Sequence, residues 1–139
     1  MKRNRLVSQQ DEWGCGIACV ASLTGLSYRE ARSRLEARKG GLIDADAPGL
    51  ELEPIIDVLR DAGILMEQRV GAKRWPSGAI VFLSEEWGRY RGTGHYLLRT
   101  DDGWMDPWAN PDEKRPRAEY LDRLPRGTTV QVALVPVED

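Results

Sequence analysis

The sequence has 139 residues, a length that suits one globular domain with one hydrophobic core, so we expect a single domain over residues 1–139. Hydrophobic residues make up 41% and charged residues 30%, and the formal net charge is −2. This balance lacks the basic excess of a nucleic-acid binder. No apolar stretch reaches the roughly 20 residues that cross a bilayer, and no secretory signal follows the basic N-terminus. The chain is therefore predicted to be cytoplasmic, which leaves open its later delivery into another cell.

The first half of the sequence predicts three helices. The first is made almost entirely of small apolar residues, so it is expected to be buried on nearly all sides and to end before Gly25. Ser27 and Glu30 have the spacing of a capping box, which predicts the start of the second helix. Residues 42–49 are expected to form a loop, and Gly40-Gly41 before them is interpreted as a helix end rather than a cleavage site. The expected helices run from Gly16 to Leu23, from Ser27 to about Arg38, and from about Glu51 to a stop at Gly63.

The second half predicts strands, because β-branched and aromatic residues concentrate there. The expected strands are Ile64–Val70, Ala79–Leu83, Tyr96–Thr100, Trp104–Asp106 and Val130–Val135. The turn residues Asp101-Asp102-Gly103 predict that the third and fourth of these strands form a hairpin. Residues Ala118–Leu124 are expected to form a short helix. Helices followed by antiparallel strands predict an α+β fold, with N-terminal helices packed on a C-terminal antiparallel sheet.

Cys15 is the candidate nucleophile. It lies where the first buried helix begins, and a helix N-terminus lowers the pKa of a thiol because its N–H groups and dipole stabilise the thiolate. Gly14 and Gly16 on either side leave room for a substrate backbone to approach. Cys19, one turn further into the same helix, is expected to be a core residue.

A thiolate nucleophile needs a base, and the base needs an acceptor that orients it. His95 is the only histidine, so any Cys–His pair must use it. Asp106 follows 11 residues later, so the predicted hairpin can bring its carboxylate to the imidazole. The backbone N–H of Cys15 and the side-chain amide of an upstream glutamine, Gln9 or Gln10, can hold an oxyanion.

The order Gln, Cys, His, Asp resembles that of the papain-like cysteine peptidases. More narrowly, WGCGIACVASLTG and GHYLLRTDDGWMDPW are similar to the bacterial bacteriocin-processing peptidase domains, which act on double-glycine leaders. The resemblance implies a papain-like fold, a peptide or protein substrate and no cofactor. It implies Cys15 as nucleophile, His95 as general base and Asp106 as the orienting acid. It selects Gln9 as oxyanion donor, because the family's glutamine commonly precedes the cysteine by six positions. Gly14 departs from the family, where an acidic residue is common.

Other interpretations of these residues stay open at this point. The same triad can run deamidation, transglutamination or amide hydrolysis on a protein target, as in a toxin or effector. A non-catalytic peptide-binding module is a further alternative. A zinc site built from Cys15, Cys19, His95 and a carboxylate is the least favoured, because these residues make a poor ligand set. The sequence leaves the oligomeric state open.

Three tryptophans, Trp13, Trp104 and Trp108, flank the proposed catalytic positions. Aromatic side chains there can wall a substrate groove or pack in the core. Core packing is the expectation for Trp104, which lies within a predicted strand.

Overall fold

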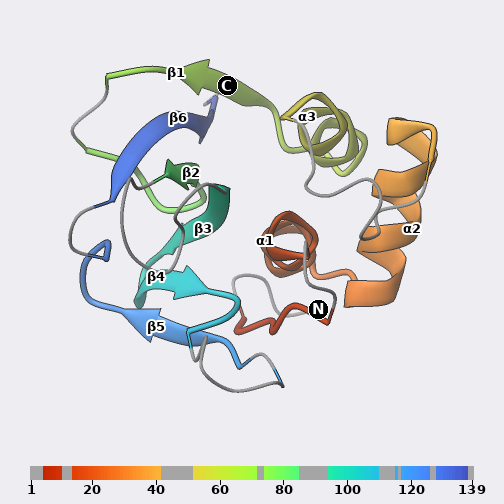
Figure 1. Ribbon diagram of the computed structural model, residues 1–139. Helices are drawn as coiled ribbons and strands as arrows, with labels where there is room; N and C mark the ends of the chain where they lie inside the picture. The colour runs from red at the N-terminus through yellow and green to blue at the C-terminus, as the bar shows by residue number, and fades with distance from the viewer. Residues whose placement is uncertain are drawn as a thin grey trace.

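The structure is a computed structural model, and it has the predicted α+β architecture, with helices packed on an antiparallel sheet (Figure 1). The helices are α1 (Cys15–Thr24), α2 (Tyr28–Lys39) and α3 (Leu52–Asp61). The strands are β1 (Met66–Arg69), β2 (Ile80–Ser84), β3 (Gly94–Thr100), β4 (Gly103–Asp106), β5 (Glu119–Leu121) and β6 (Thr129–Pro136). The structure describes residues 5–10, 14–41, 52–71, 74–84, 94–109, 115, 117–125 and 128–137. The predictions for the loop at 42–49 and for Trp13 lie outside these residues.

Helix α1 is the centre of the helical layer. All ten of its residues are buried, so the prediction of a helix covered on nearly all sides is confirmed. It contacts α2, α3 and β3, and Figure 1 shows it end-on between the sheet and the other two helices. The helix begins at Cys15 and ends at Gly25, whose φ of 79° lies in the left-handed region that glycine adopts without strain. The contact of α1 with β3 places the N-terminus of this helix against the sheet.

Helices α2 and α3 follow the signals in the sequence. The Glu30 N–H donates to Ser27 Oγ at 3.1 Å while the Glu30 side chain accepts from the Ser27 N–H, so the predicted capping box is present. Gly40 ends α2 in the left-handed conformation, which confirms its interpretation as a helix stop. Helix α3 buries an apolar face that includes Ile55 and Leu59. Both helices therefore brace α1 from the side opposite the sheet.

The six strands form one antiparallel sheet in the order β1-β6-β2-β3-β4-β5. One face of the sheet packs on the helices through residues such as Ile80 and Leu98. The other face carries a second apolar cluster with Val81 and Trp104. Trp104 is 6% exposed and contacts Trp75 edge to face at 5.7 Å, so core packing is confirmed for this tryptophan. The last strand, β6, inserts between β1 and β2, an arrangement that the sequence does not reveal.

The prediction of a helix over Ala118–Leu124 is wrong, because this segment contains β5. Strand β5 pairs with β4, and Tyr120 lies opposite Met105. Pairing with the edge of an existing sheet outweighs the weak local preference for helix. Gly103 permits the close approach of the two strands: a Cβ at this position, where φ is 123°, would lie 2.6 Å from the carbonyl oxygen of Leu121.

Candidate active site

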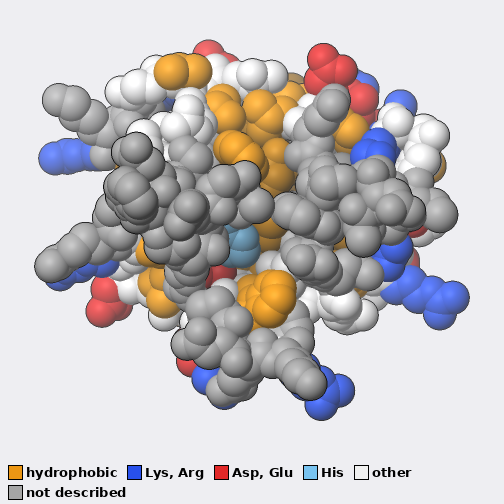
Figure 2. Space-filling model, viewed as in Figure 1, with side chains coloured by type: hydrophobic (Ala, Val, Ile, Leu, Met, Phe, Trp, Pro, Cys, Tyr) orange, Lys and Arg blue, Asp and Glu red, His pale blue; other side chains and the backbone are white. Residues whose placement is uncertain are grey.

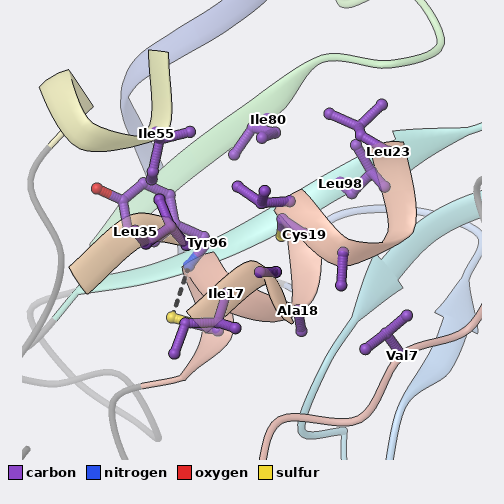
Figure 3. Close-up of a cluster of buried hydrophobic side chains, with 14 of the residues drawn as sticks. Val7, Ile17, Ala18, Cys19, Leu23, Leu35, Ile55, Ile80, Tyr96 and Leu98 are labelled. Carbon is purple, nitrogen blue, oxygen red and sulfur yellow. Dashed lines mark hydrogen bonds between the residues drawn. The ribbon is translucent and has the colours of Figure 1, made fainter. Parts of the chain in front are cut away.

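Cys15 is the first residue of α1, as predicted, and its sulfur faces the start of β3. The Tyr96 backbone N–H donates to Cys15 Sγ at 3.4 Å, a contact marked by the dashed line in Figure 3. The Cys15 residue is 9% exposed, so its sulfur lies in a mostly water-excluded position. A sulfur at a helix N-terminus that also accepts an N–H bond is in the setting that favours a thiolate.

His95 and Asp106 are brought together by the β3–β4 hairpin, as the sequence predicts. His95 Nε2 lies 2.7 Å from Asp106 Oδ1. The hairpin register explains this contact. Leu98 lies opposite Met105 and Thr100 opposite Gly103, so His95 near the start of β3 and Asp106 at the end of β4 lie at the same end of the hairpin.

The Asp106 carboxylate is held from two sides. It is completely buried, and its Oδ1 also accepts a hydrogen bond from the Trp108 backbone N–H at 3.0 Å. This second donor comes from the turn that follows β4. A carboxylate fixed in this way fixes the imidazole of His95 in turn. Because Nε2 faces Asp106, Nδ1 is the ring nitrogen that is left to face Cys15.

Cys15 and His95 each shift the pKa of the other in the direction that favours its charged form. Burial by itself raises the pKa of the Cys15 thiol, but the charge of His95, its hydrogen bond and the N–H groups of Tyr96 and Gly16 bring this pKa below its usual value. Burial by itself lowers the pKa of His95, but the charge of Cys15 and the hydrogen bond to Asp106 raise it to about 9. Both shifts favour the pair in its thiolate and imidazolium form.

Cys19 is in a different state from Cys15, although both belong to α1. It is fully buried, and its pKa is raised well above the usual range by burial and by the negative charges of Cys15 and Asp106. A thiol of this kind stays protonated and unreactive. The expectation that Cys19 is a core residue is confirmed.

The structure separates the two candidate glutamines. Gln9 is 2% exposed, whereas Gln10 is exposed to solvent. The Gln9 backbone N–H donates to the Pro107 carbonyl oxygen at 3.2 Å, which puts Gln9 beside the turn that follows Asp106. This position favours Gln9 over Gln10 as the residue that belongs to the site.

Two features of the site carry no signal in the sequence. One is the Tyr96 N–H that contacts the sulfur, because a backbone donor belongs to every residue but proline. The other is Arg5, whose guanidinium donates to the carbonyl oxygens of Ala21 and Leu26. Only the tertiary structure reveals that this arginine ties the segment carrying Gln9 to α1.

Hydrophobic surface lies next to the histidine. Figure 2 shows orange side chains that form a band from the upper edge of the molecule toward the single histidine, in pale blue. Half-buried hydrophobic residues packed on the main core include Ile56, Met66 and Phe82. The ring of Phe82 lies 4.8 Å from the ring of Tyr96, the residue after His95.

No metal centre is evident in the described part of the chain: no group of three or more His, Cys, Asp or Glu side chains there is arranged to hold an ion. Among the helices that the structure describes, none combines the length and the apolar character of a membrane span.

The architecture defines the class of the fold: it is that of a papain-like peptidase domain, with a cysteine-bearing helix packed on an antiparallel sheet. One solved structure with this fold is a double glycine motif protease from an AMS/PCAT transporter, crystallised with a leader peptide. The two chains are 14% identical and align with a TM-score of 0.54 over 97% of this chain and 93% of that one. No family model and no curated protein matches the sequence. The predicted papain-like fold is thereby confirmed.

Proposed function

We propose that the protein is a cysteine peptidase in which Cys15 attacks the carbonyl carbon of a peptide bond. The observation that carries this proposal is the arrangement of three side chains at the junction of α1 and the sheet. Cys15 lies at a helix N-terminus, the charge of His95 lowers its thiol pKa against the effect of burial, and His95 bonds to the buried Asp106 at 2.7 Å. A residue set with only a binding role has no need for such a pair.

The first half of the reaction forms a thioester. The Cys15 thiolate adds to the carbonyl carbon, and the carbonyl oxygen takes the negative charge. The Cys15 backbone N–H and the Gln9 side-chain amide stabilise this oxyanion. His95 then donates its proton to the amine nitrogen as the C–N bond breaks, so the amine leaves as a neutral group.

The second half returns the enzyme to its starting state. Neutral His95 removes a proton from a water molecule, which attacks the thioester carbon. The C–S bond breaks, the Cys15 thiolate leaves, and the protonated His95 again faces it. Throughout, Asp106 keeps the imidazole oriented and stabilises its charged form without taking the proton itself.

Two observations support a peptide as the substrate. The apolar band that leads to His95 in Figure 2 suits the side chains of an extended or helical peptide. The protein of similar fold was crystallised with a leader peptide, and it is described as a double glycine motif protease. Peptides with two glycines before the scissile bond are therefore our first candidate substrates.

The purified protein is incubated with double-glycine leader peptides, and the products are identified by mass spectrometry. We expect cleavage by the wild type and by Cys19→Ala, and none by Cys15→Ala. A deamidated glutamine or a cross-linked product would instead support the acyl-transfer alternatives. No reaction, together with equal alkylation of Cys15 and Cys19 near neutral pH, would support the binding module.

A further inference from the structure

We infer that Arg5 is a positioning residue of the site: it sets the place of the N-terminal segment that carries Gln9. The inference depends on the proposed function, in which the Gln9 amide holds the oxyanion. Residues 5–9, which precede α1 and lead to the site, form the anchoring segment.

One end of the anchoring segment is tied to the C-terminal end of α1. Arg5 Nη1 donates to the Ala21 carbonyl oxygen at 3.3 Å, and Arg5 Nη2 donates to the Leu26 carbonyl oxygen at 2.6 Å. In return, Ser22 Oγ donates to the Arg5 carbonyl oxygen at 2.6 Å. The Ala21 carbonyl oxygen also accepts from the Gly25 N–H, and Leu26 follows the helix, so Arg5 adds a positive charge at the end of α1 that carries the negative end of its dipole. A guanidinium there forms strong, charge-assisted hydrogen bonds.

The other end of the anchoring segment is tied to the sheet. The Ala118 N–H donates to Ser8 Oγ at 2.9 Å, and the Gln9 N–H donates to the Pro107 carbonyl oxygen at 3.2 Å. Pro107 directly follows Asp106, which bonds to His95. The segment is thus stretched from the end of α1 to the turn beside the catalytic residues.

Packing holds the middle of this segment, where Val7 is 7% exposed and belongs to the main core, and polar contacts hold its two ends. A cavity of about 720 Å³ borders residues 5–10, with Ser27, Tyr28 and Arg115 among its other lining residues. Leu6 is 45% exposed and so contributes little to the core. Open space lies along the segment. When one anchor is lost, the segment can therefore shift into this space.

The dimensions of the two elements couple Arg5 to Gln9. Four residues of extended chain span about 13 Å, and the rise of α1 from Cys15 to Ala21 is about 9 Å. An extended segment anchored at one end of α1 therefore reaches back to the other end, where Cys15 lies. A displacement of about 1 Å in a catalytic group can cost on the order of 100-fold in rate.

The test compares Arg5→Met with Arg34→Met, a matched control on the exposed side of α2. We measure kcat and KM on a peptidyl-Gly-Gly-aminomethylcoumarin and, separately, the rate of Cys15 alkylation by iodoacetamide. Arg5→Met is expected to lower kcat by about 10- to 100-fold with little change in KM, because the oxyanion forms only after binding. Alkylation forms no oxyanion, so its rate should stay at the wild-type value. Arg5→Lys keeps the charge and should recover part of kcat, and Arg34→Met should match the wild type.

A double-mutant cycle with Gln9→Ala decides whether Arg5 acts through Gln9. We expect Arg5→Met to cause no further loss of kcat in the Gln9→Ala background. An equal loss in both backgrounds, or a parallel loss of alkylation, would overturn the inference. Should Arg5→Met fail to fold, Ser8→Ala replaces it in the cycle, because it removes the contact with Ala118 near Gln9. A wild type that alkylates at Cys15 but cleaves no peptide would refute the proposed function itself, whereas an active enzyme with an additive cycle would refute only the role of Arg5.

Discussion

The two cysteines of α1 lie one helical turn apart, and yet their pKa values are shifted in opposite directions. Both are buried, at 9% and 0% exposure, but the pKa of Cys15 is lowered and that of Cys19 is raised. Burial acts in the same direction on both thiols. The difference comes from the neighbours: Cys15 lies beside His95 and the N–H of Tyr96, which lower its pKa, whereas the charges near Cys19 are negative and raise its pKa. In this helix, contact with the sheet decides the direction of the pKa shift.

The largest expected effect is the loss of the reactive cysteine. Cys15→Ala should reduce kcat/KM on a double-glycine peptide by on the order of 10⁴-fold or more, because no other group can form the thioester. Alkylation by iodoacetamide at neutral pH should disappear with it, since Cys19 stays protonated and buried. Peptide mapping after alkylation measures both cysteines in one experiment. Substantial labelling of Cys19 in this variant would contradict the distinction between the two thiols.

Asp106→Asn should lower kcat/KM by roughly 100-fold, within the range found for general acid–base groups. The amide oxygen can still accept from His95, but it carries no charge to stabilise the imidazolium. The pKa of His95 should then fall from about 9, because the contact with Asp106 helps to raise it. A pH profile of kcat/KM measures this change as an alkaline limb that moves to lower pH. Glu119→Gln, on the exposed edge of β5, is the control.

The pH dependence should separate two reactions of the same sulfur. Peptide turnover is expected to decline as the pH rises through about 9, because the deprotonated His95 cannot protonate the leaving amine. Alkylation of Cys15 needs only the thiolate, so it should not decline in that range. At the acid side, alkylation should persist below the usual titration range of a cysteine, since the pKa of Cys15 is lowered. Two profiles with the same alkaline limb would argue against His95 as the acid.

The smallest effect is expected at Cys19. Cys19→Ala should leave kcat/KM within about twofold of the wild type and lower the free energy of unfolding by about 1 kcal/mol, a typical cost for a small change in a core. Urea denaturation and the peptide assay together test this expectation. A large loss of activity without a loss of stability would assign Cys19 a chemical role.

The sequence predicts those parts of the molecule that local signals specify. The helices were predicted from the capping box at Ser27 and from the glycines that end the first two helices. The hairpin was predicted from the turn at Asp102-Gly103. The hairpin in turn predicted the contact of His95 with Asp106, since their register follows from a tight turn.

What the sequence could not predict depends on pairing between distant segments. Strand β5 forms because β4 offers an edge with which it can pair. Strand β6 lies between β1 and β2, and this position depends on pairing with strands that are distant in the sequence. The anchoring role of Arg5 is of the same kind, because its partners are 16 and 21 positions away. Local pattern thus named the candidate site residues, and long-range contacts arrange their surroundings.

The contact between Cys15 and Tyr96 joins residues 81 positions apart. During synthesis the ribosome releases α1 long before β3 and β4, so the nascent chain carries a cysteine with the pKa of an ordinary thiol. The groups that lower the pKa of Cys15 reach the sulfur only when β3 packs against the helix. The lowered pKa is therefore a property of the completed fold, and loss of the contact between α1 and β3 should return it to the value of a free thiol.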